Sequence, residues 1–598
     1  MKSNYFFKSL ALVVLTTLVT NVSAKEFIIP DGATNVELTA ALNEAKTGDV
    51  ILINGIVTMN SMVDISKNVT IKIGDVNFAA FDGQGITRLF DIHPEVIEGA
   101  KLVFEGLDFY GGNGCANPSD LQDGGAARIF AGETEFISCY FSQNEAKRGG
   151  AIFVAETGTK VTFRHCEAWE NVAHSGGGDS RGGYLFVDGD NDVAHEFCKI
   201  SANQSIGGRG GALCLFGNGT RRFYYTVFSH NKAGNWIQED GNLIKADKDN
   251  QPTSAGEYEG GVAFITGGAI TFESCGFVGN QSFSHSAIIR GWGDNTNVTF
   301  VNSVFSKNET LNDQAPIWNT AGTWTFVNCI LAENLGSNPG NGGVFRGGDG
   351  KTYLNIFNSV WVRNTFRNGE GAQDLTGELD KVTVKNSIIG LVVGDETQIT
   401  VSDNHTIPTK SNISVYKLSP SDVTQSDYAL FENTGIDFDK GLRYSKFGMP
   451  YYLLTNGSMV TKLGDPALLA DCDLDSDMFG RKHSPAADGS IVAGPVAIET
   501  EDEYDDVGTS INNPAIGLAK ENIRVIGSSN GILAIDFGDL KGSAKGRLIS
   551  VTGQEVENVF STHVVSKGYY NMSAAPGMYI LEVKIAGKTY TQKLIVTK

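Results

Sequence analysis

Three arginines that hold equivalent places in a repeated pattern are the side chains whose type and spacing best suit chemistry. Arg148, Arg181 and Arg209 each stand directly before a pair of glycines, and the same place is held by Asp123 before them and Glu259 after them. The guanidinium group is a planar fork of N–H donors that matches a carboxylate. A stack of such groups is suited to the repeated carboxylates of an acidic, uronate-containing glycan.

A structural role is the competing interpretation of these arginines, and the sequence slightly favours it. Like charges that lie one strand spacing apart, about 5 Å, repel one another and need counter-charges. Glu145, Asp179 and the end acids Asp123 and Glu259 are candidates for that role, so the arginines could form a ladder that pairs with these acids and with turn carbonyls. Both interpretations stay open, and Asp123, Asp179 and Glu259 join the three arginines as candidate glycan-binding residues.

Two short runs of aspartates have the alternate spacing of oxygen ligands around Ca²⁺. They are Asp188, Asp190 and Asp192 in one loop, and Asp471, Asp473 and Asp475 in another. Neither run is followed by the glutamate of an EF-hand loop, so solvated acidic turns are the favoured interpretation and weak Ca²⁺ sites the alternative. The sequence has no Gly-x-Ser-x-Gly, P-loop or His-Glu-x-x-His motif, and it identifies no catalytic residue.

The arginines belong to a pattern that recurs eight times. Each copy has an aromatic or aliphatic residue, a small residue three positions later, an apolar residue two further on, and an asparagine three beyond that. The asparagines are Asn144, Asn171, Asn203, Asn231, Asn280, Asn308, Asn334 and Asn364. Their steps of 26 to 32 residues, with one step of 49, predict a solenoid of β-coils that carries an insertion at Ala233–Glu259.

Equivalent residues of successive coils lie about 4.8 Å apart, so identical side chains form ladders along a solenoid. The asparagines can pass amide hydrogen bonds from coil to coil. The small position of the pattern holds Cys139, Cys166, Cys198, Cys275 and Cys329 where other copies have Ser or Thr. We expect a column of buried thiols, with a disulfide between adjacent coils as the alternative. The paired glycines are expected at tight corners.

Charge and hydropathy limit the partners and the location of the chain. A net charge of −21 argues against nucleic acid or an anionic membrane as the main partner, because both would repel it. Residues 1–24 are typical of a secretory signal peptide, since Lys2 and Lys8 precede the apolar run Leu10–Val19. We expect no transmembrane segment in the mature chain from Lys25, because no later apolar stretch reaches 18 residues.

The segment Phe141–Ile152, with Phe-x-x-Asn followed by Gly-Gly-Ala-Ile, resembles the repeat of the chlamydial polymorphic outer membrane proteins. More broadly, the chain resembles the pectate-lyase-like superfamily, with 35–46 as its cap helix and 48–52 as its first strand, and 464–496 resembles the closing segment of many bacterial β-helix surface proteins. The resemblance implies an all-β fold, a right-handed parallel β-helix over 25–498. Lyases, hydrolases and adhesins share this scaffold, and its lyases use an Arg or Lys base beside acid-bound Ca²⁺, so the activity stays open.

A second domain is expected near the C-terminus. Residues 499–516 form an acidic linker, and 517–598 show the short alternating strands of a small β-sandwich. The runs Ala575–Ile580 and Lys593–Val596 resemble the type A C-terminal sorting domain of the Bacteroidota type IX (Por) secretion system. The resemblance implies export by the type IX machinery, with a sorting signal that includes Gly577, Tyr579 and Lys593.

These observations predict a secreted or surface-attached protein that binds a glycan or a host-surface ligand along the flank of its β-helix, as an adhesin does. The first alternative is a polysaccharide lyase or hydrolase that acts on an acidic glycan, with Ca²⁺ as its one candidate cofactor. The second is a structural component of the cell surface. The sequence does not decide whether the chain is an enzyme.

Overall fold

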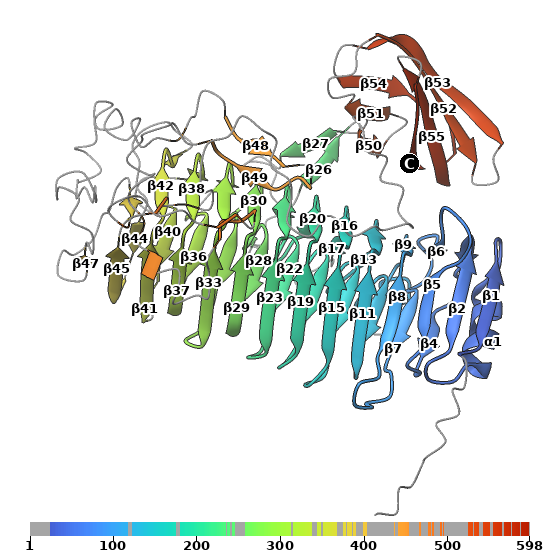
Figure 1. Ribbon diagram of the computed structural model, residues 1–598, viewed down its shortest axis with the longest axis horizontal. Coiled ribbons are helices and arrows are strands. Elements are labelled where there is room, and N and C mark those ends of the chain that lie inside the picture. Colours follow the sequence, from blue (N-terminus) through green and yellow to red (C-terminus); the bar gives the residue numbers. More distant parts are fainter. Residues whose placement is uncertain are drawn as a thin grey trace, which may run out of the picture.

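The computed structural model is a solenoid of β-coils whose strands pair in parallel from coil to coil (Figure 1). It describes residues 24–117, 122–174, 180–234, 236–239, 242–245, 258–311, 315–337, 344–348 and 351–366, and shorter stretches within 375–402, 436–494 and 524–596. The expected signal peptide, apart from Ala24, and the expected acidic linker lie outside these residues. The predicted all-β fold with a parallel β-helix is confirmed.

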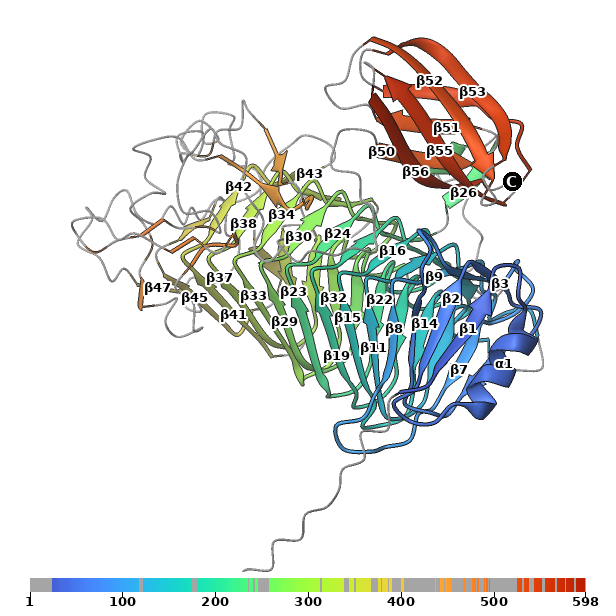
Figure 2. The same ribbon diagram turned by 45° about the vertical axis from the view of Figure 1, so that its right-hand side comes forward.

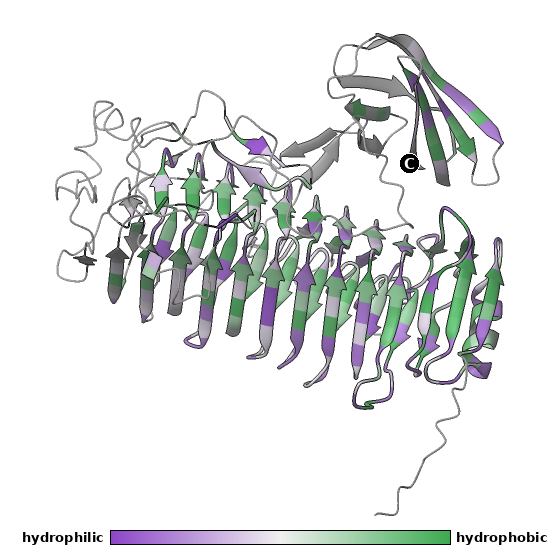
Figure 3. Ribbon diagram, in the orientation of Figure 1, coloured by the Kyte–Doolittle hydropathy of each residue, from purple (hydrophilic) through white to green (hydrophobic). Residues whose placement is uncertain are grey.

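The longest sheet has 14 strands, and hydrophobic and hydrophilic residues alternate along them because one face of the sheet lines the interior (Figure 3). Its strands are β1 (Glu26–Pro30), β2 (Val50–Asn54), β5 (Thr70–Ile73), β8 (Leu102–Glu105), β11 (Glu133–Ile137), β15 (Lys160–Arg164), β19 (Asp192–Glu196), β23 (Thr220–Tyr224), β29 (Gly268–Glu273), β33 (Thr296–Val301), β37 (Gly322–Val327), β41 (Thr352–Phe357), β45 (Lys381–Lys385) and β47 (Ile399–Ser402).

A second sheet of 11 strands follows the glycine-pair corners and carries the candidate site. Its strands are β4 (Val63–Ile65), β7 (Phe90–Ile92), β10 (Ala127–Ile129), β14 (Ile152–Val154), β18 (Leu185–Val187), β22 (Leu213–Leu215), β28 (Ala263–Ile265), β32 (Ile289–Gly291), β36 (Ile317–Asn319), β40 (Phe345–Gly347) and β44 (Leu375–Gly377).

Two further sheets, of 12 and eight strands, complete the coils. The 12-stranded sheet has β3 (Ile56–Thr58), β6 (Ala80–Asp82), β9 (Asp108–Tyr110), β12 (Tyr140–Ser142), β16 (Glu167–Trp169), β20 (Lys199–Ser201), β24 (Val227–Ser229), β30 (Gly276–Val278), β34 (Val304–Ser306), β38 (Ile330–Ala332), β42 (Val360–Val362) and β46 (Ile388–Ile389). The eight-stranded sheet has β13 (Glu145–Ala146), β17 (Val172–His174), β21 (Gln204–Ile206), β25 (Lys232–Ala233), β31 (Gln281–Ser282), β35 (Glu309–Thr310), β39 (Leu335–Gly336) and β43 (Thr365–Phe366).

The helix α1 (Asn35–Glu44) lies at the N-terminal end of the stack, as the predicted cap (Figure 2). It begins with a capping box in which Thr34 and Glu37 satisfy each other's backbone N–H groups, and it buries Leu38, Ala41 and Leu42. The segment 48–52, which the sequence predicts as the first strand, corresponds to β2. The strand β1 comes before the helix and pairs with β2. Within the described residues, no helix has the length and apolar character needed to cross a membrane.

Two corners of each repeated coil require a left-handed backbone. In one coil, Ser138 just before the cysteine has a φ of 53° and Gln143 just before the asparagine has a φ of 54°. The same two places have positive φ in all eight copies of the pattern. Non-glycine residues adopt this conformation rarely, so the fixed spacing of the pattern reflects two sharp bends of the chain.

The glycine pairs form a third corner for two different reasons. Gly149 has a φ of 59°, which favours glycine, whereas the second residue, Gly150, is restricted by space. A Cβ atom on Gly150 would lie 2.1 Å from the carbonyl oxygen of Gly183 in the next coil. Adjacent coils therefore touch through bare backbone at this corner.

The repeated asparagines form a continuous hydrogen-bonded ladder. The Asn280 Nδ2 group donates to Asn308 Oδ1 (2.9 Å) and to the carbonyl oxygen of Phe228 (3.0 Å). Its Oδ1 atom accepts from the backbone N–H (3.0 Å) and the Nδ2 group (3.1 Å) of Asn231. The same side-chain bond joins every pair of neighbours from Asn144 to Asn364. Each turn is thus held to the turns on both sides.

The interior is filled by columns of stacked rings. Phe104, Phe136 and Phe163 stack at 5.1 Å between ring centres, with planes within 7° of parallel. His195 continues this column between two phenylalanines, and burial lowers its pKa to about 3, so it is neutral. Phe104 belongs to a coil that the sequence pattern missed, because this coil has Gly112 in place of the asparagine. The Gly112 N–H still donates to Asn144 Oδ1 (2.9 Å).

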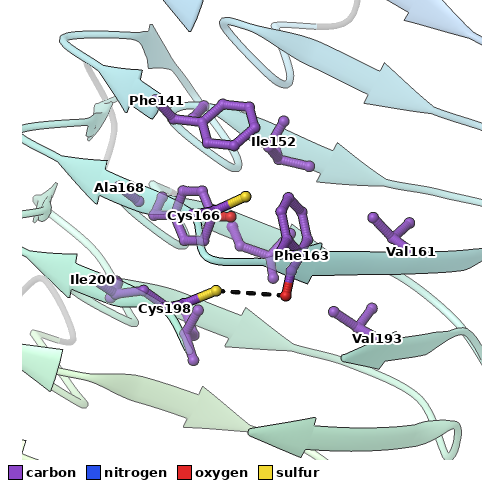
Figure 4. Close-up of a cluster of buried hydrophobic side chains, with 14 of the residues drawn as sticks. Phe141, Ile152, Val161, Phe163, Cys166, Ala168, Val193, Cys198 and Ile200 are labelled. Carbon is purple, nitrogen blue, oxygen red and sulfur yellow. Dashed lines mark hydrogen bonds between the residues drawn. The ribbon is translucent and has the colours of Figure 1, made fainter. Parts of the chain in front are cut away.

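The five cysteines of the small position are buried inside the solenoid, and Figure 4 shows Cys166 and Cys198 among them. Their thiols point at backbone carbonyls: Cys166 Sγ lies 3.3 Å from the oxygen of Phe136 and 3.4 Å from that of Arg164. Burial raises the pKa of the Cys166 thiol well above its usual value. Seven of the eight cysteines lie in the described residues, and all seven are free thiols.

The described parts of the insertion and of the expected closing segment are additions to the regular coils. Within the insertion, β26 (Trp236–Glu239) and β27 (Asn242–Lys245) pair as an antiparallel hairpin. The described parts of 436–494, which include the antiparallel pair β48 (Arg443–Tyr444) and β49 (Pro450–Tyr451), pack on the outer face of the 12-stranded sheet. There the Tyr452 hydroxyl bonds Ser306 and donates to Glu333 (2.8 Å). The described residues of this segment therefore cover the side of the stack.

The C-terminal residues form two antiparallel sheets. One has β50 (Arg524–Ser529), β51 (Ile532–Asp536) and β54 (Lys567–Asn571); the other has β52 (Gly542–Ser550), β53 (Glu555–Val564), β55 (Gly577–Ile585) and β56 (Lys588–Val596). Buried side chains from both sheets, such as Ile535 and Leu581, belong to one hydrophobic cluster. The β-sandwich expected for 517–598 stays a prediction.

Replacement of one ladder asparagine tests the hydrogen-bonded spine. Asn280→Ala should lower the free energy of unfolding by about 3 kcal/mol or more, because it leaves several buried polar groups unpaired. Urea unfolding followed by circular dichroism measures the change. Asn297→Ala, at an exposed position of β33, is the matched control. Equal stability of the two variants would refute the role given to the ladder.

Thiol alkylation tests the interior column. The half-buried Cys115 should react with iodoacetamide before any of the five ladder cysteines, which should react only after unfolding, because only an accessible thiolate is nucleophilic. Peptide mass mapping of native and urea-unfolded protein resolves each cysteine. Labelling of Cys166 in the native protein at the rate of Cys115 would contradict the buried column.

Candidate functional site

The predicted arginine corner exists as a ladder in space. Backbone bridges run in parallel from Asp123 to Arg148, from Arg148 to Arg181 and from Arg181 to Arg209. The next coil places Glu259 beside Arg209, because Gly210 donates its N–H to the carbonyl oxygen of Glu259 (2.8 Å). The structure therefore brings together five of the six candidate glycan-binding residues, while Asp179 lies outside the described residues.

Each end of the ladder is closed by a buried carboxylate. Arg148 donates to both oxygens of Asp123, from Nε at 2.8 Å and from Nη2 at 2.6 Å. Arg209 Nε lies 3.1 Å from Glu259 Oε2. Asp123 and Glu259 are only 1% and 3% exposed, so these pairs hold the two outer guanidinium groups in place. The predicted pairing of arginines with acids is present at both ends.

Glu259 has a second partner that sequence reasoning missed. Arg290, on β32 of the next coil, is fully buried and places its Nε 3.3 Å from Glu259 Oε1. Burial lowers the pKa of Arg290 to about 10, and the nearby Glu259 charge opposes that shift, so the side chain stays charged at neutral pH. Arg290 has no special place in the repeat, and only the register of neighbouring coils brings it to Glu259.

Aromatic rings form the floor under the arginines. The outward residues in the middle of β14, β18 and β28 include Phe153, Phe186 and Phe264, which align in register across the sheet with Cys214 between them. The Arg148 guanidinium lies 5.0 Å from the ring centre of Phe153 and 5.4 Å from that of Phe186. Arg209 lies 4.6 Å from Phe264. These contacts are cation–π interactions that spread the positive groups over the outer face of the sheet.

The middle arginine also extends across this face. The Arg181 guanidinium lies 5.1 Å from the ring of Phe216, which follows the end of β22 in the next coil. Arg181 thus connects the corner ladder with a second line of outward residues at the ends of the strands. The geometry offers a row of N–H donors over buried rings, with the half-buried Phe216 beside them, which suits a ligand with repeated acidic groups.

The aspartates of the first predicted Ca²⁺ run, Asp188, Asp190 and Asp192, are not brought together in the same way. Asp190 and Asp192 each accept a separate backbone N–H, from Asn218 (2.6 Å) and Thr220 (3.1 Å). Asp188 lies 3.9 Å from Arg148. Within the part of the chain that the structure describes, no three His, Cys, Asp or Glu side chains gather as a metal site. Ca²⁺ binding stays a prediction, as it does for Asp471, Asp473 and Asp475, which lie outside the described residues.

The proposed sorting-signal residues lie on the C-terminal hairpin. Gly577 begins β55, where the Tyr579 hydroxyl donates to the carbonyl oxygen of Ala575 (2.9 Å). Lys593 on β56 pairs with Ile580 across the hairpin. These contacts place the residues on one hairpin, and their role in export stays a prediction.

Comparison with known proteins adds little to this geometry. No family model and no curated relative match the chain. Among solved structures, the enzymatically active domain of tailspike protein 4 from bacteriophage CBA120 aligns with 91% of this chain at 10% identity and a TM-score of 0.25. The chain spans 60% of that tailspike chain. Similarity at this level carries no argument about the site.

Neutralising the shared carboxylate tests the paired end of the ladder. Glu259→Gln should lower the free energy of unfolding by about 3 kcal/mol or more, because Arg209 and the buried Arg290 would face each other without their common counter-charge. Glu273→Gln removes the partner of the exposed Arg222 and should cost less than about 1 kcal/mol. Thermal and urea unfolding measure both changes. Equal losses would show that the Glu259 pairs are ordinary surface contacts.

Proposed function

We infer that this protein binds an acidic glycan along the outer face of its 11-stranded sheet, without cleaving it. One observation carries the proposal: three guanidinium groups recur in consecutive coils and lie over a row of aromatic rings. Coils repeat about every 4.8 Å, so the donors form a line along the solenoid axis. A linear polymer with a carboxylate on each unit presents acceptors in a line of its own.

The pairing of the outer arginines fits this function as well as a structural one. Arg148 and Arg209 each keep an acid at one end of the ladder, which fixes the position of their guanidinium groups before any ligand arrives. A guanidinium group has five N–H donors, so one arginine can serve more than one acceptor at a time. Fixed donors lose little conformational entropy on binding, which favours affinity.

The surface setting of the proposal comes from the sequence. The signal peptide and the type IX sorting resemblance favour a secreted or surface-attached protein, which meets polysaccharides of other cells or hosts. We propose that the β-helix acts there in the manner of an adhesin. The −21 net charge restricts an acidic ligand to the local arginine face, because the rest of the surface repels it.

Substitution of the middle arginine tests the binding. Arg181→Ala should weaken binding of the full chain to immobilised polygalacturonate by about tenfold or more, since a charge-assisted pair of hydrogen bonds is lost. Arg181→Lys keeps the positive charge without the planar pair of donors, so its affinity should lie between those of Arg181→Ala and the unchanged chain. Arg222→Ala, on the 14-stranded sheet, is the matched control and should bind as the unchanged chain does. Biolayer interferometry at two salt concentrations measures the affinities.

Two results would overturn the proposal. Unchanged affinity of Arg181→Ala would show that the arginine ladder is structural only. A rise in ultraviolet absorbance from unsaturated sugar ends, in the presence of Ca²⁺ and abolished by Arg181→Ala, would show a polysaccharide lyase in place of a binding protein.

A further inference from the structure

A tryptophan extends the same face beyond the arginines. Trp292 follows the end of β32, and 49% of its surface is exposed. Backbone hydrogen bonds place it in the strand-end line: Thr266 donates to the carbonyl oxygen of Leu215, and Trp292 donates to that of Ile265 (2.8 Å). Phe216, Thr266 and Trp292 are therefore equivalent residues of three successive coils.

The indole ring is supported from below by a buried charge. The Arg290 guanidinium lies 4.9 Å from the ring centre of Trp292 and 3.5 Å from that of Trp318 on the next strand, so it is held between two tryptophans. Arg290 is also fixed by Glu259 and by a bond from Nη1 to the carbonyl oxygen of Gly291 (2.7 Å). Trp292 thus rests on a rigid base and presents open surface to solvent.

The distance of the Trp292 ring from the arginines sets the minimum length of a ligand that contacts both. The Arg181 guanidinium lies over Phe216, and Trp292 is two coils further along the same line, or about 10 Å away along the axis. A ligand of one or two sugar units at Arg181 does not span this separation, whereas a longer chain along the axis does.

We propose that Trp292 is a stacking platform for a sugar ring of a long acidic glycan whose carboxylates are held by the arginine ladder. The inference rests on the proposed function and adds a second subsite to it. An amphipathic ring fits the platform better than an apolar protein partner does, because threonines flank Trp292 in the line, at 266 and 320. Single-stranded nucleic acid also stacks on tryptophan, but its successive bases are bound on successive aromatic platforms, whereas threonines stand on both sides of Trp292 in this line.

Binding of two ligands of different length tests the platform. Trp292→Ala in the full chain should weaken polygalacturonate binding by about tenfold, the loss expected for one stacked ring. It should leave binding of digalacturonate unchanged, which also shows that the variant is folded. Trp292→Phe should keep most of the affinity. Tyr353→Ala removes an aromatic side chain of similar exposure (40%) from the 14-stranded sheet and should have no effect.

The outcomes separate this inference from the function on which it rests. If Arg181→Ala weakens polymer binding and Trp292→Ala does not, the platform is refuted and the arginine site stands. If both variants bind polygalacturonate as tightly as the unchanged chain does, the arginine site and the platform are both refuted. Equal, Trp292-dependent binding of fully methyl-esterified polygalacturonate would refute an acidic ligand. Tighter binding of a single-stranded oligonucleotide than of polygalacturonate would refute a glycan.

Discussion

A buried asparagine side chain, repeated once per coil, satisfies the backbone at a bend that every repeated coil shares. Its amide group donates across to the next asparagine and back to a carbonyl of the preceding coil, while its oxygen accepts two N–H groups. A tight turn leaves backbone groups without strand partners, and their burial without hydrogen bonds would cost several kcal/mol per coil. The ladder removes that cost and fixes the register between coils.

A fixed register has consequences on the outside of the solenoid. Residues at one place in the repeat stack at strand spacing whether or not their side chains attract one another, so three arginines lie in a row. The buried acids Asp123 and Glu259 offset the repulsion between the arginines, and so do the aromatic rings under the guanidinium groups. The contacts that offset the repulsion also hold the N–H donors of the arginines in fixed positions. Structural pairing and ligand binding are therefore compatible uses of one ladder.

The repeat made much of this predictable. The asparagines, the cysteines and the arginines each keep a constant spacing to the pattern, and in a parallel stack constant spacing means contact. The coil of Phe104 was missed because Leu107 and Gly112 stand at its small position and its asparagine position. The strand β1 was missed because the chain detours through α1 before the stack continues.

The sequence by itself determined the fold, the ladders and the corner on which the arginines lie, since these depend on intervals along the chain. Only the tertiary structure decided what surrounds them. Arg290, Phe216 and Trp292 occupy no marked place in the repeat, and their contacts arise because outward side chains of neighbouring coils differ. The packing of 436–494 on the 12-stranded sheet was hidden for a related reason: it joins residues more than 100 positions apart, such as Glu333 and Tyr452, and no local interval records such a pair.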